Sequence, residues 1–275
     1  PFLLTVYGYQ FRNPILKISK KIYDYFFGKR ILKHAHRIFV ASETQQEEIL
    51  NILGEENKNG KLMLQENCVP VRNYENLGGN NELLLKYNQG KEIKLLTIAR
   101  ILPRKGIKNL IFALHSIVRK CNFSNIKLIV VGPDCGEAAN IRKTIKRLKL
   151  NDYAEIIGAV PYEQVKEFLG ICDIFVLPSL YEGLPLALLE AMAAGRAVIF
   201  TDLPSTDRII TSGLDGLLVA PGDVNSLTEG ILRLSMDASL REKLGINARR
   251  KAKKFDTQIE SVRLKKTYEQ ILSIG

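Results

Sequence analysis

The sequence lacks any apolar run long enough to cross a membrane. A membrane span takes roughly 20 apolar residues, and the run at residues 126–131 is already broken by Lys127. Cysteine is scarce as well: the four cysteines show neither the paired spacing of metal ligands nor the density of a disulfide scaffold. These absences predict a globular protein of the reducing cytoplasm without a transmembrane helix.

Several ligand-binding motifs are also missing. Neither a G-x-G-x-x-G nor a Walker loop follows the expected strand at 94–99, which argues against NAD binding and P-loop chemistry. The three histidines have no acidic or cysteine partner at metal-ligand spacing, and no Asp-x-Asp pair occurs. The sequence therefore predicts no metal site.

The charge is strongly positive. Lysine and arginine number 40 against 29 aspartates and glutamates, a net charge of +11, which calls for an anionic partner: a nucleic acid, an acidic lipid or a phosphate-bearing substrate. The cations gather at 17–37, 142–149 and 249–254, and none of these segments matches a nucleic-acid motif. We expect mostly solvated helix faces and no nucleic-acid partner.

From residue 92 onward, strand and helix patterns alternate as in a doubly wound parallel sheet. Strands are expected at 94–99, 126–131, 155–157, 173–177, 197–201 and 216–219. Helices are expected at 108–120, 138–148, 162–171, 184–194, 224–237 and 239–253. Residues 89–253 are therefore predicted to form one complete nucleotide-binding-type α/β domain.

The first ninety residues predict only part of a domain. Strands are expected at 2–6, 37–41 and 61–64, and helices at 13–27, 29–34 and 43–53. Residues 73–90 are rich in Asn and Gly, which is typical of a linker. Because the chain opens inside a strand pattern, we expect residues 1–88 to be the later part of an α/β domain, with a front part on the order of 100 residues missing.

Two carboxylates bracket a Gly-Leu-Pro turn after the expected strand at 173–177. Glu182 stands at the carboxyl end of this strand, where an open α/β sheet presents groups to a ligand. Glu190 lies in the apolar helix that follows, where a carboxylate needs a partner such as a hydroxyl-rich ligand. In the structural alternative, Glu182 favours the helix dipole and Glu190 is an ordinary surface residue. Both interpretations stay open on the motif alone.

A second loop, at residues 99–106, carries two cations. Arg100 and Lys105 lie between a strand and a helix, and Gly106 lets the backbone bend closely. Cations beside the free N–H groups of a helix N-terminus form an anion site, although they can also be simple surface charge. The position at the crevice edge of the sheet favours phosphate binding.

Two further strand ends carry glycine. Gly132 and Pro133 end one strand, and Gly158 ends another shortly before Val160. Glycine at these points would let a flat base approach the backbone, or would simply turn the chain.

Together these motifs resemble the retaining glycosyltransferases of family four, from about residue 5 to residue 272. The resemblance rests on the following residues: Arg100 with Lys105 and Gly106, Gly132, Gly158, Pro178-Ser179, Glu182 and Glu190 followed by Ala-Met-Ala-Ala-Gly195, and Gly213-x-Asp-Gly216 before Pro221-Gly-Asp223. It implies the α/β GT-B fold of two facing Rossmann-like domains, with the second complete and the first partial. Residues 254–275 would be the helix that crosses back to the first domain.

The resemblance implies a nucleoside-diphosphate sugar as co-substrate, with no cofactor and no metal. Arg100 and Lys105 would bind the diphosphate and offset charge on the leaving group, Glu182 would contact the donor sugar, and Glu190 would bind the ribose. The other donor-binding residues would be Gly183, Leu184, Pro185, Leu186, Ser179, Gly132, Pro133 and Val160. Transfer would retain the anomeric configuration.

The first domain departs from the family pattern. Many relatives have Thr-x-His-Gly where this chain has Thr-Val-Tyr7-Gly8. Tyr7 can donate a hydrogen bond to a sugar hydroxyl, but it cannot replace imidazole as an acid or base near neutral pH. Ala99 replaces the glycine usual before Arg100, and the Gly-rich acceptor loop is absent. We expect Tyr7 and Gly8 to lie at the donor sugar.

The expected function is hexosyl transfer in the cytoplasm to a polysaccharide, lipid-linked or other glycan acceptor of the cell envelope. The stretch 14–37, from Pro14 to Arg37, alternates cations with apolar residues. It either binds an acidic membrane, which would place the protein on the inner face of the cell membrane, or packs on its own domain. Two other functions remain open: a nucleotide-sugar epimerase of the same fold, and a truncated remnant that binds nucleotide sugar without catalysis.

Overall fold

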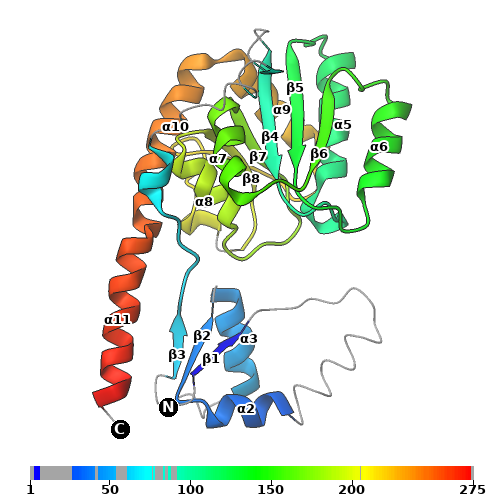
Figure 1. Cartoon of the computed structure of the whole chain (residues 1–275). Helices are drawn as coiled ribbons and strands as arrows, with labels where there is room; N and C mark the ends of the chain where they lie inside the picture. The colour runs from blue at the N-terminus through cyan, green and yellow to red at the C-terminus, as the bar shows by residue number, and fades with distance from the viewer. Residues whose placement is uncertain are drawn as a thin grey trace. The chain divides into compact units, whose positions relative to one another are not determined.

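The computed structural model describes residues 3–6, 27–40, 43–53, 61–75, 77, 83, 86–87, 92–204 and 206–273. The chain forms two compact units: residues 1–68 with 257–275, and residues 69–256. Each unit contains a sheet with helices packed on it (Figure 1). The segments around Arg100 and Glu182 both belong to the second unit.

The second unit is built on a six-stranded parallel sheet with the order β6-β5-β4-β7-β8-β9. Its strands are β4 (Ile93–Ile98), β5 (Ile126–Val131), β6 (Ala154–Gly158), β7 (Ile174–Leu177), β8 (Ala197–Thr201) and β9 (Leu217–Val219). All residues of β7 and β8 are buried, as in strands covered on both faces. The chain runs outward from β4 to β6 and then returns to β7, so the strand order reverses between β4 and β7.

Helices cover both faces of this sheet (Figure 1). One apolar cluster packs α5, α6 and α9 on one face, and another packs α7 and α8 on the opposite face, while α10 contributes to both. The helices are α5 (Ile107–Arg119), α6 (Ala138–Arg147), α7 (Tyr162–Ile171), α8 (Leu186–Ala193), α9 (Val224–Met236) and α10 (Ala238–Ala252), with 3-10 turns η5 (Thr206–Arg208) and η6 (Lys253–Phe255). The predicted doubly wound α/β domain is confirmed.

Proline shifts the start of helix α8. The sequence predicts a helix at 184–194, whereas α8 begins at Leu186 because Pro185 takes an extended N-cap conformation, with φ −74° and ψ 121°. Leu184 therefore belongs to the preceding loop. By contrast, the strand predicted at 126–131 and the helix predicted at 162–171 are confirmed to the residue.

The first unit has a three-stranded parallel sheet with the order β1-β2-β3. Its elements are β1 (Leu3–Val6), α2 (Lys29–His34), β2 (Arg37–Val40), α3 (Glu43–Leu53), β3 (Leu62–Leu64) and the C-terminal helix α11 (Thr257–Ser273). Within this unit the Tyr268 ring of α11 packs edge-on against Phe39, with centroids 6.4 Å apart. The helix expected at 13–27 lies, except for Phe27, outside the described residues.

Residues 69–87 belong to the second unit, although the sequence groups residues 1–88 together and predicts a linker at 73–90. Val71–Tyr74 forms a 3-10 turn, η3, and both Tyr74 and Tyr87 are buried. Two buried tyrosines carry enough apolar area to anchor a segment that is otherwise rich in Asn and Gly. The Val69 N–H also donates to the Phe255 carbonyl at 2.9 Å. The points where the chain enters and leaves this unit are therefore neighbours.

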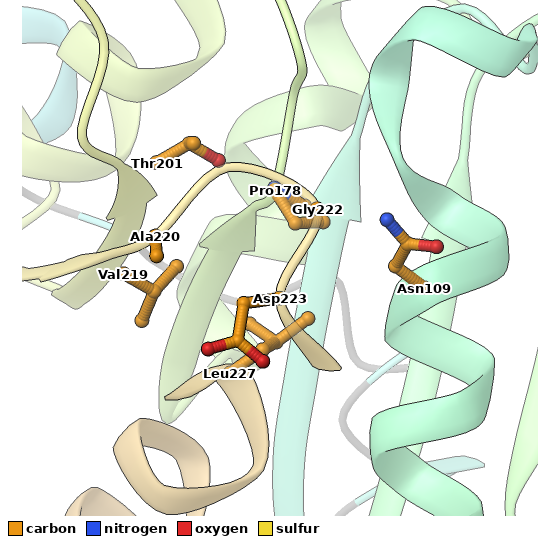
Figure 2. A pocket seen from close by; sticks show the side chains of 8 residues that line it. All are labelled: Asn109, Pro178, Thr201, Val219, Ala220, Gly222, Asp223 and Leu227. Atoms are coloured by element: carbon orange, nitrogen blue, oxygen red, sulfur yellow. The ribbon is translucent and has the colours of Figure 1, made fainter. Parts of the chain in front are cut away.

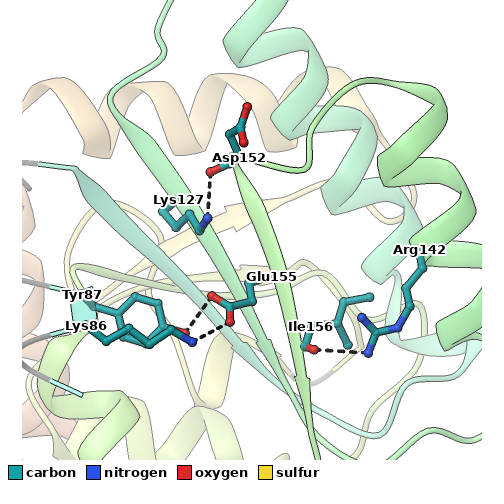
Figure 3. Close-up of polar contacts among 7 residues, drawn as sticks. All are labelled: Lys86, Tyr87, Lys127, Arg142, Asp152, Glu155 and Ile156. Carbon is teal, nitrogen blue, oxygen red and sulfur yellow. Dashed lines mark hydrogen bonds and ion pairs between the residues drawn. The ribbon is translucent and has the colours of Figure 1, made fainter. Parts of the chain in front are cut away.

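A carboxylate on strand β6 holds the end of this segment (Figure 3). Lys86 Nζ donates to Glu155 Oε1 at 2.6 Å, and the Tyr87 hydroxyl donates to Oε2 at 2.9 Å. Burial alone would raise the pKa of Glu155, but these hydrogen bonds outweigh it and hold the pKa below its usual value. The other contacts in Figure 3 tie side chains to backbone carbonyls: Lys127 to Asp152 and Arg142 to Ile156.

We predict that Tyr87→Phe destabilises the protein more than Lys86→Met does. The buried Tyr87 loses a hydrogen bond to a carboxylate, at a cost of about 1–2 kcal/mol, whereas the exposed Lys86 contributes less than about 1 kcal/mol. Because the pKa of Glu155 is lowered in the folded state, this stabilisation is present above the unfolded-state pKa and is lost as the pH falls through the folded-state pKa. Urea denaturation at neutral and acidic pH measures both effects. An equal or larger cost for Lys86→Met would contradict this prediction.

Candidate functional site

Two loops flank the point where the strand order reverses. The loop 99–106 leads from β4 through the 3-10 turn η4 (Pro103–Lys105) into α5, and the loop 178–185 leads from β7 into α8. Because β4 and β7 are paired parallel strands, both loops leave the carboxyl edge of the sheet next to each other. In open α/β sheets this edge is where ligands bind.

The two loops are in backbone contact. Gly106 has a left-handed φ of 68°, and a Cβ atom at this position would lie 1.9 Å from the carbonyl oxygen of Pro178. The Leu180 N–H donates to the Arg104 carbonyl oxygen at 2.7 Å. Only glycine permits so close an approach in this conformation. The loops therefore form one continuous surface.

An ion pair joins the side chains of these loops. Lys105 Nζ donates to Glu182 Oε1, and the buried Ser179 hydroxyl donates to the same oxygen at 2.8 Å. The Lys105 and Glu182 side chains are only 12% and 10% exposed, so bulk water screens their attraction weakly. Arg100 lies exposed in the same loop. The structure thus brings together a cation, a hydroxyl and a carboxylate that the sequence places on two separate loops.

The second carboxylate, Glu190, lies inside the unit on helix α8. It is 5% exposed, and its Oε1 accepts hydrogen bonds from the hydroxyls of Tyr162, at 2.8 Å, and Tyr74, at 3.0 Å. Burial raises the pKa of Glu190 above its usual value, and the hydrogen bonds from Tyr162 and Tyr74 oppose that rise. Burial also raises the pKa of Tyr74, so this phenol stays protonated and donates.

The structure contradicts the surface position of Glu190 and helix capping by Glu182, which the structural alternative assumes. Glu190 is not a surface residue, because it is almost entirely buried. Glu182 does not cap helix α8, whose N-cap residue is Pro185 and makes no side-chain cap hydrogen bond. The prediction that a carboxylate among apolar residues needs a partner is confirmed, and within the described chain two tyrosine hydroxyls are partners.

No local sequence pattern points to these tyrosines. Tyr74 lies in a stretch that looks like a linker, and Tyr162 is the first residue of a helix whose apolar residues alone define its pattern. Their approach to Glu190 depends on packing between segments far apart in the chain, which no local pattern encodes.

The loop that follows strand β5 is in backbone contact with the loop 99–106. Gly132 has a φ of 144°, and a Cβ atom there would lie 1.9 Å from the Ala99 carbonyl oxygen, while the Ile101 N–H donates to the Pro133 carbonyl at 2.8 Å. Gly132 is thus required for packing of the loop backbones. Gly158, by contrast, has open space where a Cβ atom would stand, and Val160 packs against the core near α7 and α8.

Asp134, which the sequence motifs did not single out, organises the same loop. Its Oδ1 accepts from the backbone N–H groups of Gly136, Glu137 and Ala138 at 2.9, 3.1 and 3.1 Å. The hydrogen bonds from Ala138 and Gly136 lower the pKa of this exposed carboxyl. Asp134 therefore remains charged and holds the start of α6 in place.

A separate small hollow opens at the same edge of the sheet, between α5 and α9 (Figure 2). Eight residues line it: Asn109, Pro178, Thr201, Val219, Ala220, Gly222, Asp223 and Leu227. Of these, Pro178 begins the loop 178–185, while the Asp223 carboxylate accepts the Asn225 N–H as the N-cap of α9. We assign this hollow to the packing around the start of α9.

Some predicted residues lie outside the described chain. Tyr7, Gly8 and residues 14–26 fall in this group, so their predicted roles stay predictions. Within the described part of the chain, every helix falls short of the length and apolar character that a membrane crossing needs.

A doubly wound sheet with a cation, a hydroxyl and two carboxylates around its switch point defines a nucleotide-binding type of α/β protein. More particularly, the chain belongs to the family of glycosyl transferases group 1, which it matches over residues 85–251. This match confirms the predicted glycosyltransferase resemblance and supports a transferase over an epimerase.

The relatives are glycosyltransferases as well. The chain is 28% identical over 273 residues to an uncharacterized glycosyltransferase of Methanocaldococcus jannaschii, covering 98% of this chain and 69% of that protein. It is 29% identical over 252 residues to the N,N'-diacetylbacillosaminyl-diphospho-undecaprenol alpha-1,3-N-acetylgalactosaminyltransferase of Campylobacter jejuni, covering 89% of this chain and 63% of that enzyme. The chain therefore spans roughly two thirds of the length of these relatives.

A solved structure shares the fold. The chain superimposes on Anabaena HepE, determined in complex with UDP and glucose, with a TM-score of 0.78 and 18% identity, covering 88% of this chain and 66% of HepE. HepE is a GT-B glycosyltransferase, and the predicted GT-B α/β fold class is confirmed.

We predict that Gly106→Ala is far more damaging than Gly213→Ala. Both glycines have positive φ, 68° and 80°, so alanine costs each about 1–2 kcal/mol of backbone strain. Only at Gly106 would the new methyl group collide with a backbone oxygen, which adds roughly 2–3 kcal/mol or forces the loops apart. Denaturant titration measures the two costs. Equal destabilisation would show that the contact between Gly106 and Pro178 is not constrained.

Proposed function

We propose that this chain carries the donor site of a retaining, metal-independent glycosyltransferase, which moves a hexosyl group from a nucleoside-diphosphate sugar to a glycan or lipid-linked acceptor. The observation that carries the proposal is the joining of Lys105, Ser179 and Glu182 at the switch point of a group 1 glycosyltransferase fold. The complex of HepE with UDP and glucose supports a nucleotide-sugar donor for this fold.

The diphosphate would bind at the loop 99–106. Lys105 and the exposed Arg100 supply positive charge there, and the N–H groups at the start of the following helix, α5, lack intrahelical acceptors. As the bond to the leaving diphosphate breaks, negative charge grows on its oxygens. Cations already fixed in place stabilise that charge without reorganisation, which lowers the barrier.

The sugar would lie against the loop 178–185. Glu182 is paired with Lys105, and its carboxylate oxygens can accept hydrogen bonds from sugar hydroxyls near the reacting carbon. The backbone N–H groups of residues 183–186, at the start of α8, complete the proposed cradle. Glu190, deeper on the same helix, would accept a ribose hydroxyl of the nucleotide. Gly158 and Val160 would border the base.

Retention would follow from attack on the face that the leaving group vacates. The acceptor oxygen forms a bond to the anomeric carbon as the bond from that carbon to the diphosphate oxygen breaks. A leaving phosphate oxygen takes the acceptor's proton, so no protein base is required. The chain's own residues position the donor and stabilise charge.

The proposed acceptor is a polysaccharide or lipid-linked glycan. The Campylobacter relative is named for a diphospho-undecaprenol-linked acceptor. Phe27 and Ile31, which are exposed beside the cations Arg30 and Lys33 in the first unit, support contact with an acidic membrane surface. This contact would place the protein on the cytoplasmic face of the cell membrane.

We predict that Glu182→Gln lowers kcat by roughly 10²-fold or more while the Kd for the nucleoside diphosphate changes little. Arg100→Ala should weaken both, because its cation acts on the diphosphate before and during the reaction. Steady-state kinetics with isothermal titration calorimetry separate the two patterns. Wild-type turnover in Glu182→Gln would remove this carboxylate from the site.

We also predict that EDTA leaves sugar transfer unchanged, because the proposed leaving-group charge is offset by Arg100, Lys105 and a helix N-terminus. Release of nucleoside diphosphate is followed with and without the chelator, and then with added Mg²⁺. Complete loss in EDTA with recovery in Mg²⁺ would contradict metal independence.

A further inference from the structure

Among the described residues, the hydrogen bonds to the Glu190 carboxylate reach Oε1. Both tyrosine hydroxyls donate to Oε1, and their two oxygens lie 3.2 Å apart. Each phenol has a single proton to donate, and hydrogen bonds donated to a carboxyl oxygen favour its ionised form. The Tyr74–Tyr162 pair therefore orients Glu190 and favours its ionised form, while leaving Oε2 outside these two hydrogen bonds.

We infer that Tyr74 and Tyr162 are positioning residues for nucleotide binding: they hold Glu190 by Oε1 so that Oε2 accepts a ribose hydroxyl of the donor nucleotide. The inference rests on the proposed function, in which Glu190 binds the ribose. It assigns a specific task to Tyr74, which lies in the stretch 73–90 that the sequence presents as a linker.

The residues packed around Glu190 show why its ionisation depends on the two tyrosine hydroxyls. Strands β7 and β8, which flank α8, contain no charged residue. On α10, Arg249 binds the carbonyls of Ala193 and Ala194 at the C-terminal end of α8. From η3, Tyr74 faces the carboxylate, whereas Arg72 is exposed. The hydrogen bonds of Tyr162 and Tyr74 thus oppose the desolvation that raises the pKa of Glu190.

The two tyrosines differ in how firmly they are placed. Tyr74 is 3% exposed and packs in the apolar cluster with Val69 and Val71. Water therefore cannot replace the Glu190 carboxylate as the partner of its hydroxyl. Tyr162 is 61% exposed at the start of α7, where water can replace its hydroxyl. Loss of the Tyr74 hydroxyl should therefore cost more than loss of the Tyr162 hydroxyl.

The test measures the Kd of UDP, GDP and ADP by calorimetry between pH 5 and 8 and then follows the nucleotide that binds the wild type most tightly. We expect Tyr74→Phe to raise that Kd about 5–10-fold and Tyr162→Phe about 2–3-fold at neutral pH. Because each variant lacks a hydrogen bond that favours the ionised carboxylate, binding should begin to weaken at a higher pH than in the wild type as the solution is acidified.

Tyr87→Phe is the matched control, because it also removes a buried phenol that donates to a carboxylate, Glu155, but at strand β6. It should leave nucleotide affinity and its pH profile unchanged. In a double-mutant cycle, Tyr74→Phe should have little further effect once Glu190→Gln is present, since the tyrosine acts through the carboxylate. A carbon-13 titration of the Glu190 carboxyl should show a higher pKa in Tyr74→Phe.

The outcomes separate the two claims. Unchanged nucleotide binding in Glu190→Gln would overturn the ribose role and this inference with it. Weaker binding in Glu190→Gln, with both tyrosine variants like the wild type or with an unshifted Glu190 titration, would overturn the inference alone. The tyrosine variants could also lose affinity equally at every pH and additively with Glu190→Gln. That result would assign the tyrosines to packing and would also overturn the inference.

Discussion

The site depends on how closely two backbones can approach at the switch point of the sheet. Gly106 lies so near the Pro178 carbonyl that a single added carbon atom would collide with it. That approach lets the Leu180 N–H reach Arg104, and it sets Lys105 within reach of Glu182. Gly132 repeats the arrangement one strand away, against Ala99. The positions of the Lys105 cation and the Glu182 carboxylate thus depend on the packing of the loop backbones that carry them.

This constraint gives the proposed chemistry its preorganisation. Lys105 and Glu182 are both largely withdrawn from water and paired with each other, so a diphosphate and a sugar would meet side chains that are already held in place. Glu190 follows the same principle by other means. Burial disfavours the ionised form of its carboxylate, and hydrogen bonds from two phenols oppose this effect.

The parts of the fold that local patterns control were predictable from the sequence. The apolar runs of β5 and β7 and the periodicity of α7 place these elements correctly, and strand ends next to a switch point direct attention to Arg100, Lys105 and Glu182. What could not be predicted depends on contacts between distant segments. Tyr74 and Tyr162 approach Glu190 only after three segments pack together, and Tyr87 converts an apparent linker into part of the second unit.

If the joined loops at the switch point form a nucleotide-sugar donor site, a bound nucleoside diphosphate must shield their amides, which hydrogen–deuterium exchange measures. Amide exchange of the protein is compared with and without a saturating nucleoside diphosphate: UDP, GDP or ADP. We expect slower exchange at 99–106 and 178–190, with no change around Tyr87 and Glu155. Unchanged exchange at both loops, or protection only at other sites, would contradict a donor site at these loops.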